Sequence, residues 1–512
     1  MASSGKPNPA ESGVARPLLT LPQAVRNSLR SYLPATGGGT VPLLLGYSGG
    51  IDSTVLLHVL AQLATEMPLR LHAVHVHHGL SPNADAWVAA CEAQCQSLRV
   101  PLQVMRVDLA PHRALGVEGA ARAARYAAFS NAARAIDCGL LLLAQHRDDQ
   151  AETLLTQLLR GAGVAGLAAM PQARRLGALD ILRPLLHNTR ADIEAWARQH
   201  RLRWIEDESN QDQHRRRNFL RHAVLPRLEQ ASPAASANIA RSAAHLAQAA
   251  QLLSVMARED LQRLAGHTAS MPATAPQALS TAAPQALFTA APQALPIAAL
   301  LALGELRAAN VLREWCVWHG APQLSTARMA ELLRQMATPR GDASPLLQMP
   351  GWRFRRYRNL LFLLNNLSDL PVPPGAWSRP WQMPARGDAV SPQHWSELGG
   401  WLVPQWSVGE GLSLARLAVV LADAALYWRL RRGGERIRLS AAQPSQTLGN
   451  LWQAQGLPPW QRQRLPLLWC GDTLLAVPGL GCAADCRAQP GEPGLSLQWR
   501  LSRPDDPLAP VV

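Results

Sequence analysis

The side chains with the clearest capacity for chemistry begin in one short run of small and polar residues. That run reads Ser48-Gly49-Gly50-Ile51-Asp52-Ser53. Its glycines have no Cβ atom, so the backbone can turn sharply and approach a ligand closely. An apolar segment at residues 43–45 precedes the run, and apolar residues recur at helical spacing after it. A glycine loop that leads into a helix N-terminus offers free N–H groups and a positive dipole end, which suit a phosphate group.

The run is not a Walker A loop. That motif needs a lysine that contacts the phosphates, and the only lysine of this chain is Lys6. The pattern S-G-G-x-D-S instead resembles the pyrophosphate loop of the N-type ATP pyrophosphatases, which split ATP between the α and β phosphates and transfer AMP to an oxygen atom. A plain turn whose serines cap a helix is the alternative. The order of strand, loop and helix favours the ATP site.

A second group of reactive side chains follows the apolar residues 140–144. Asp149 and Glu152 are three positions apart, so they share one face of the helix expected here. Open α/β sheets bind ligands at the carboxyl ends of their strands. A carboxylate pair in that place could bind Mg²⁺ or take a proton from an amine. Alternatively, the two carboxylates only stabilise the positive end of the helix.

Arginines form two further groups. Arg122 and Arg125 share a face of the helix expected at residues 116–135, where they contact either solvent or the phosphates of ATP or RNA. The acidic residues 206–208 are followed by an arginine cluster at residues 215–221, which includes Arg217 and Arg221. This second group is either a surface ion pair, which contributes little to stability, or one wall of an active site.

The apolar pattern then predicts the elements that position these groups. We expect strands at residues 43–45, 69–78, 102–107 and 140–144, and helices at 52–66, 116–135 and 191–200. Strands that alternate with helices predict an α/β domain with a parallel sheet. Near residues 352–358, arginines alternate with aromatic residues. That segment is either a surface that binds phosphates and stacks bases or an ordinary edge strand.

Composition limits the function classes. The chain has 512 residues and a net charge of +14, which predicts two to four domains and an acidic partner such as nucleic acid. Seven cysteines without a disulfide framework indicate reduced thiols. Residues 1–16 lack the apolar core of a signal peptide, and no run reaches the roughly 18 apolar residues of a membrane span. We therefore expect a cytoplasmic protein without a membrane partner and with a disordered leader at residues 1–20.

Taken together, these segments resemble the tRNA(Ile)-lysidine synthetase family. The matching segments are residues 48–53, 75–85, 118–129, 146–153, 160–163, 204–210 and 217–221. The most specific runs are Ile-Glu-Asp-Glu-Ser-Asn at 205–210 and Arg-Asn-Phe-Leu-Arg at 217–221, since other pyrophosphate-loop enzymes share the remaining segments. Family members commonly have two histidines before the Asp-Asp pair. Here His146 is present, but the preceding position is Gln145.

The resemblance implies an α/β fold of three domains. Residues 21–228 would form a pyrophosphate-loop catalytic domain with a parallel sheet, of the adenine nucleotide alpha hydrolase-like type. Residues 229–366 would form a mainly helical middle domain that binds tRNA. Residues 367–424 would be a linker and the start of the last domain, and residues 425–500 a small α+β C-terminal domain that also binds tRNA. Repeated Ala-Pro-Gln-Ala-Leu units predict a flexible insertion at about residues 268–296.

The resemblance also implies an activity, the ATP-dependent ligation of L-lysine to C2 of the wobble cytidine of tRNA(Ile) with a CAU anticodon. The cytidine O2 would attack the α-phosphate and release pyrophosphate, and the lysine amine would then attack C2 and release AMP. The cofactors would be ATP and Mg²⁺, with Asp52 and Asp149 as metal ligands. The catalytic residues would be Asp52, Arg122, Arg125, His146, Asp149 and Glu152. Oligomeric state stays open, with a homodimer as one option.

Three rival functions share part of this pattern. A tRNA thiolase would use the same ATP loop but needs paired cysteines to carry sulfur, and the chain has no C-x-x-C motif. A small-molecule ligase or amidotransferase would not need two basic C-terminal domains. A non-catalytic RNA-binding protein would explain the charge but not residues 48–53 together with residues 146–152.

Overall fold

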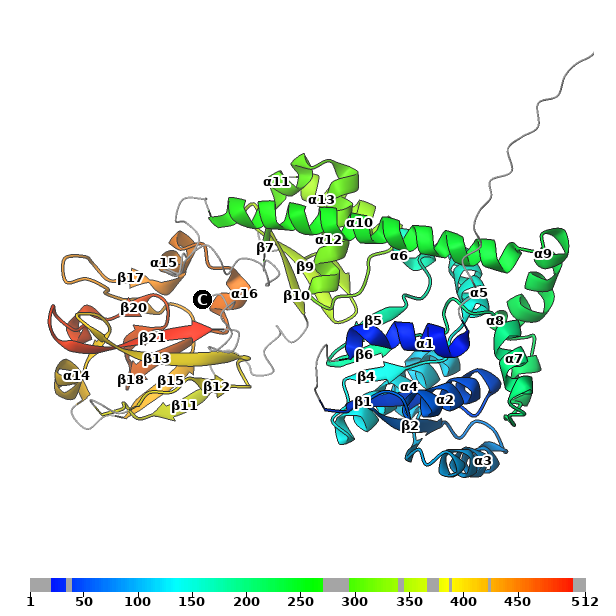
Figure 1. The fold of residues 1–512 in the computed structure, drawn as a ribbon. Coiled ribbons are helices and arrows are strands. Elements are labelled where there is room, and N and C mark those ends of the chain that lie inside the picture. The colour runs from blue at the N-terminus through cyan, green and yellow to red at the C-terminus, as the bar shows by residue number, and fades with distance from the viewer. Residues whose placement is uncertain are drawn as a thin grey trace, which may run out of the picture. The chain divides into compact units, whose positions relative to one another are not determined.

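The computed structural model describes residues 20–33, 39–269, 294–338, 345–365, 377–385, 389–421 and 425–500. The chain divides into two compact units, Met1–Leu252 and Leu253–Val512. The boundary falls within the long helix α10 (Ala235–Ala269), drawn in green in Figure 1. Residues 1–19 of the expected leader and 270–293 of the expected insertion lie outside the described residues.

The first unit contains a six-stranded sheet with the strand order β3-β2-β1-β4-β6-β5. Its strands are β1 (Val41–Gly46), β2 (Leu69–His77), β3 (Leu102–Arg106), β4 (Leu140–Leu142), β5 (Ala173–Leu176) and β6 (Leu179–Leu182). All neighbouring pairs are parallel except β5 with β6. The chain moves from β1 to β2 and β3, and then returns to the other side of β1 at β4. The strand order therefore reverses between β1 and β4, and this is where such sheets bind ligands.

Among the described residues before α10 there are nine α-helices, of which α1 precedes the first strand and the others connect the strands or follow them. They are α1 (Leu21–Leu29), α2 (Ile51–Leu63), α3 (Ala84–Ser97), α4 (Gly116–Ala135), α5 (Arg147–Leu158), α6 (Val164–Leu167), α7 (Arg190–Gln199), α8 (Arg216–Phe219) and α9 (Leu225–Ala231).

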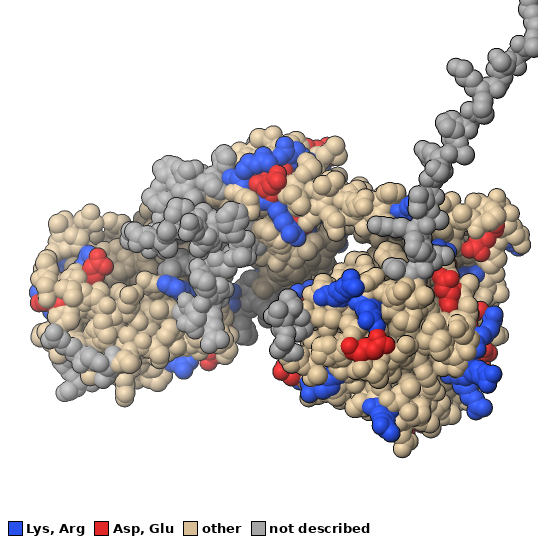
Figure 2. All heavy atoms as spheres, in the orientation of Figure 1, with Lys and Arg blue, Asp and Glu red and all other residues tan. Residues whose placement is uncertain are grey.

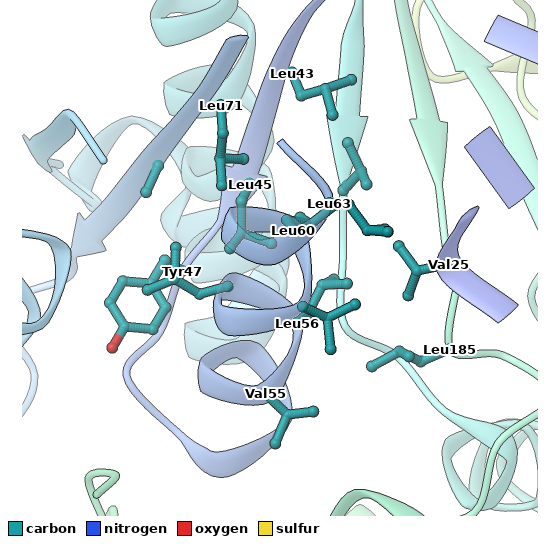
Figure 3. Close-up of a cluster of buried hydrophobic side chains, with 14 of the residues drawn as sticks. Val25, Leu43, Leu45, Tyr47, Val55, Leu56, Leu60, Leu63, Leu71 and Leu185 are labelled. Atoms are coloured by element: carbon teal, nitrogen blue, oxygen red, sulfur yellow. The ribbon is translucent and has the colours of Figure 1, made fainter. Parts of the chain in front are cut away.

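Both faces of the sheet are covered, which explains why β1 is apolar at successive positions. Leu43 and Leu45 join a buried cluster with side chains of α1, α2, α3 and α7, whereas Leu44 joins a second cluster with side chains of α4. Figure 3 shows part of the first cluster, in which Leu60 of α2 lies beside Leu45 of β1. The alternation of side chains along a strand assigns consecutive leucines to opposite layers.

The predicted α/β class and parallel sheet are confirmed, and the helix expected at residues 116–135 is α4. The sequence did not predict the antiparallel edge strand β5. Its sequence Ala-Arg-Arg-Leu has no apolar alternation, and it pairs with β6 through a turn in which Gly177 has a φ of +61°. Charged residues are common on edge strands because they oppose pairing with other chains.

The second unit begins with a helical region that packs on an antiparallel sheet of order β7-β10-β9-β8. Its elements are β7 (Ala294–Pro296), α11 (Ile297–Ala302), α12 (Glu305–Trp318), α13 (Thr326–Ala337), β8 (Pro345–Met349), β9 (Trp352–Tyr357) and β10 (Leu360–Asn365). In β9, Phe354 is 0% and Tyr357 is 5% exposed. We expected either an edge strand or a surface that stacks bases, and both expectations are wrong. β9 pairs with a strand on each side, and these two rings are buried.

The rest of the second unit consists of antiparallel sheets of order β11-β15-β18-β19-β20, β12-β13-β21-β14 and β16-β17. Their strands are β11 (Ser378–Trp381), β12 (Gln393–Trp395), β13 (Gly400–Val408), β14 (Leu412–Ser413), β15 (Leu426–Leu430), β16 (Arg436–Ile437), β17 (Gln446–Thr447), β18 (Pro466–Cys470), β19 (Thr473–Val477), β20 (Gly481–Cys482) and β21 (Pro493–Arg500), and the helices are α14 (Leu414–Leu421), α15 (Leu448–Ala454) and α16 (Pro459–Arg462). Because β11 pairs with β15 and β13 pairs with β21, residues before 425 are part of these sheets.

Among the described residues, no helix has both the length and the apolar character needed to cross a membrane.

Substitution of Leu60 by alanine should lower the free energy of unfolding by about 2–5 kcal/mol, because it leaves a cavity between α2 and the sheet. Leu60 is fully buried, whereas Leu80 is 59% exposed. The matched control Leu80→Ala should change this energy by less than about 0.5 kcal/mol. Urea denaturation of both variants tests the expectation, and equal effects would contradict the assigned core.

Candidate active site

Residues 48–53 form the end of the turn between β1 and α2 and the first residues of α2, at the point where the strand order reverses. Gly49 has a φ of +85°, and a Cβ atom there would lie 2.4 Å from Cδ1 of Ile205 and 2.9 Å from Sγ of Cys91. Both the backbone angle and the surrounding space therefore require glycine. Ile205 also donates its N–H to the carbonyl of Gly49 at 2.9 Å, which fixes the loop to a segment far away in the sequence.

The hydroxyl groups of the loop face each other. The Oγ atoms of Ser48 and Ser53 are 3.0 Å apart, and the Ser53 hydroxyl donates to the carbonyl of Gly50 at 3.0 Å. The helix α2 begins at Ile51, so the first N–H groups after the loop have no acceptor within the helix. The loop is thus ordered by its own side chains while the positive end of α2 stays available for an anion.

Asp52 lies in the first turn of α2 between two cationic groups. Nη1 of Arg190 donates to both carboxylate oxygens, at 3.0 and 2.9 Å. Nε2 of His146 lies 3.6 Å from Oδ1. Burial raises the pKa of Asp52, and the charges of His146 and Arg190 offset only part of that effect.

His146 is the residue that precedes α5, and three carboxylates surround its ring. Asp52 and Asp149 lie 3.6 and 3.5 Å from Nε2, and Asp148 lies 3.6 Å from Nδ1. The side chain is 2% exposed. Burial alone would lower the pKa of His146, but the carboxylates outweigh burial and raise it above the ordinary value. The geometry therefore favours the imidazolium form.

Asp149 and Glu152 share one face of α5, and two arginines bind both of them. Oδ1 of Asp149 accepts from Nη2 of Arg217 at 2.6 Å and of Arg221 at 3.1 Å. Glu152 accepts from Nε of Arg217 at 2.7 Å and from Nε of Arg221 at 2.5 Å. Because Asp149 is 7% and Glu152 1% exposed, these are buried carboxylates with close counter-charges.

The charged groups around Asp149 determine how strongly its carboxylate holds a proton. Burial would raise the pKa of Asp149, but His146, Arg217 and Arg221 outweigh burial and hold it below the ordinary value. Oδ2 of Asp149 also accepts the backbone N–H of His146 at 3.0 Å. A carboxylate that holds its proton this weakly is a poor general base near neutral pH. The arrangement favours a role in binding or orienting a cation.

Arg122 and Arg125 lie on α4 and are exposed. Nε of Arg125 is 3.4 Å from Nε2 of His78, and the Arg122 guanidinium lies 5.2 Å from the ring centroid of Tyr126. Within the described part of the chain, neither arginine forms an ion pair. Desolvation and the charges of Arg122 and Arg217 lower the pKa of Arg125, which indicates that these cations belong to one electrostatic neighbourhood.

The structure brings most of the predicted residues together and adds three arginines. Residues 48–53, His146, Asp149 and Glu152 form one contiguous group, whereas Arg122 and Arg125 stand beside it. Arg217 and Arg221 follow the acidic residues 206–208 in the sequence, but their ion pairs are with Asp149 and Glu152. Arg190 was missed, and its only signal in the sequence is its position at the start of a predicted helix.

Asp52 and Asp149 fit a magnesium ion only in part. Among the described residues, no group of three or more His, Cys, Asp or Glu side chains has the arrangement of a metal site. Mg²⁺ usually keeps several waters and binds one or two carboxylates together with substrate phosphates. Both carboxylates lie within 3.6 Å of the same nitrogen of His146. This donor set fits an ion that also depends on phosphate oxygens.

The cysteines do not fit sulfur transfer. All seven are buried and free. Burial raises the pKa of Cys91 to about 12 and that of Cys95 to about 11. The thiolate is the nucleophilic form of cysteine, so these thiols are poorly placed to carry sulfur to a substrate.

Family models match three parts of the chain. Residues 12–228 match the family model of the PP-loop domain, residues 295–362 that of the TilS substrate binding domain, and residues 426–499 that of the TilS substrate C-terminal domain. The chain is 38% identical to the tRNA(Ile)-lysidine synthase of Escherichia coli O157:H7 over 463 residues, which cover 90% of this chain and 96% of that protein. It is 39% identical to the same enzyme of Xanthomonas axonopodis pv. citri over 470 residues, covering 92% and 96%.

Solved structures also match parts of the chain. A U34-tRNA thiolase from Methanococcus maripaludis matches 44% of this chain and 78% of its own length, with a TM-score of 0.38 and 18% sequence identity.

Replacement of Glu152 by alanine should lower the free energy of unfolding by about 1–3 kcal/mol, because Arg217 and Arg221 keep Asp149 but each loses a hydrogen bond to a fully buried carboxylate. The control is Glu66→Gln, since Glu66 forms an exposed ion pair with Arg26. Such pairs contribute about 0–1 kcal/mol. Chemical denaturation distinguishes the two, and a Glu152→Ala variant as stable as the control would show that the arginine pair is not a structural contact.

Protonated His146 should stabilise the folded state at low pH. Because folding raises its pKa, the contribution is complete below about pH 6.5, the ordinary histidine value, and is lost as the pH rises through the folded-state pKa. Denaturation curves of the wild type and of His146→Gln between about pH 6 and 9 should converge as the pH rises. Parallel curves would mean that His146 does not titrate with folding.

Proposed function

Because the chain belongs to the tRNA(Ile)-lysidine synthase family, we propose that it ligates L-lysine to C2 of the wobble cytidine of a CAU-anticodon tRNA(Ile), using ATP. The observation that carries this proposal is the contact between the two predicted halves of the site. His146 lies within 3.6 Å of Asp52 in the nucleotide loop and of Asp149 in the carboxylate pair. An ATP site and a site for a cationic nucleophile would thus adjoin, as the two-step reaction requires.

In the first step, O2 of the cytidine attacks the α-phosphate and pyrophosphate leaves. Residues 48–53 would hold the pyrophosphate with their N–H groups and hydroxyls. Arg122 and Arg125, on the neighbouring helix α4, would face the negative charge that develops on the α-phosphate. Mg²⁺ held by Asp52 and Asp149 together with phosphate oxygens would neutralise the leaving group.

In the second step, the ε-amine of lysine attacks C2 and AMP leaves. The amine has an ordinary pKa of about 10.4, so it arrives as an ammonium and would release a proton to water before it attacks. Asp149 and Glu152 are suited to bind that ammonium, because they are ionised carboxylates on one helix face. The arginines that neutralise them, Arg217 and Arg221, could turn to the phosphates of ATP. The carboxylates would then pair with the lysine ammonium and the arginines with the phosphates, so every charge would keep a counter-charge.

The tRNA would contact the protein through arginines. On the face drawn in Figure 2, Lys and Arg side chains lie in separate patches, and several patches adjoin acidic residues. The net charge of +14 supports binding of a polyanion. The basic side chains of the described residues on this face do not form one continuous strip along which the tRNA would lie. The wobble base must leave the anticodon stack to reach the site, which a single-stranded loop permits at low cost.

The test is AMP release from ATP by the purified protein with CAU-anticodon tRNA, with and without L-lysine. Turnover should require both, and mass spectrometry should find lysine on the tRNA. Asp149→Asn should lower kcat by about 100-fold or more, since it removes a charge aimed at the reacting groups. Asp85→Asn is the control, because Asp85 pairs with Arg106 at the surface.

Turnover that needs tRNA but is indifferent to lysine would contradict the proposed substrate while leaving the adenylation step in place. A sulfur donor would then be tested in place of lysine. Normal turnover by Asp149→Asn would contradict the assigned role of the carboxylate pair.

A further inference from the structure

Arg190 connects Asp52 of the nucleotide loop to α7, a helix outside the loop. Its Nη1 atom contacts both oxygens of Asp52, at 3.0 and 2.9 Å. Asp52 is the acidic residue of the loop, 138 positions earlier in the sequence.

The backbone of Arg190 is held firmly. Arg190 is the first residue of α7, and its N–H donates to Oδ2 of Asp148 at 2.7 Å. The preceding residue, Thr189, caps the helix, because its Oγ1 accepts the N–H of Asp192 at 2.9 Å. Ile193 and Ala197 of the same helix are fully buried in the cluster that also contains α2. The helix is therefore fixed to the layer that carries the loop.

The side chain of Arg190 is held as well. Its Nε donates to Oε1 of Glu194 at 3.0 Å, one turn along α7. This contact leaves the Nη1 end of the guanidinium directed at Asp52. The Arg190 and Asp52 side chains remain 38% and 28% exposed. A bridge that served stability alone would gain little at such exposure, so the accessible position beside the loop calls for another explanation.

We propose that Arg190 is a positioning residue that fixes the carboxylate of Asp52 beside residues 48–53 and so sets the affinity of the loop for ATP. The inference rests on the proposed function only through the use of ATP. Without Arg190, the Asp52 side chain would be free to rotate, and its charge would repel the phosphates in some rotamers. With Arg190, one rotamer is held and its charge is balanced.

The test measures ATP binding directly, by equilibrium dialysis of the full-length protein with labelled ATP and Mg²⁺. Arg190→Met should weaken binding by about 10- to 100-fold, the range found when a residue that supports a ligand-binding group is removed. Arg190→Lys should restore most of the affinity. The native contact uses a single nitrogen atom on both oxygens, and a lysine ammonium, as a compact charge, can reproduce it.

The matched control is Arg198→Met. Arg198 lies on the same helix and pairs with the same Glu194, at 3.1 Å, but is 74% exposed and does not contact Asp52. Its removal should leave ATP binding unchanged. In steady-state assays, Arg190→Met should raise the KM for ATP and leave the KM for lysine unaltered, a split that a general loss of structure would not give.

Wild-type ATP affinity in Arg190→Met would overturn the proposal, as would an equal loss in Arg190→Lys. Thermal unfolding shows whether each variant folds, and Arg190→Gln replaces Arg190→Met if the latter does not. If the protein binds ATP in an Arg190-dependent way but makes no lysidine, the proposed function fails and this assignment stands.

Discussion

Burial of Asp149 and Glu152 is the constraint on which the rest of the site depends. A buried charge that loses its partner destabilises a protein by several kcal/mol, so these carboxylates can exist on α5 only if cations reach them. Arg217 and Arg221 supply those cations from a segment more than 60 positions later. The site is therefore complete only when the chain between residues 152 and 221 is folded.

The histidine between the two halves has a related role. His146 contacts a carboxylate of the nucleotide loop and a carboxylate of α5 with the same ring nitrogen. Asp52 and Asp149 both lie within 3.6 Å of this nitrogen, so a change in the charge of one carboxylate alters the electrostatic potential at the other. The departure at Gln145 leaves this arrangement intact, since the contacts are those of His146.

Much of the fold and part of the site were predictable from local pattern. Leu43–Leu45 and residues 116–135 follow their expected strand and helix because apolar spacing and glycine placement act over a few residues. The partners of Arg190, Arg217 and Arg221 were not predictable, since spacing along the chain says nothing about contacts across 65 to 138 positions. In β9, the alternation of arginine and aromatic residues suggested a binding surface, but Phe354 and Tyr357 point into the core.

The burial of every cysteine has a practical consequence for experiments on this protein. A thiol reagent that cannot enter the core should leave the native chain unmodified, so the native sequence already serves as an unreactive background. One cysteine introduced on the surface, for example on α7 or α4, would then be the sole attachment point for a fluorophore or spin label. Distances between the loop and its neighbouring helices could be followed in solution without first removing any native residue.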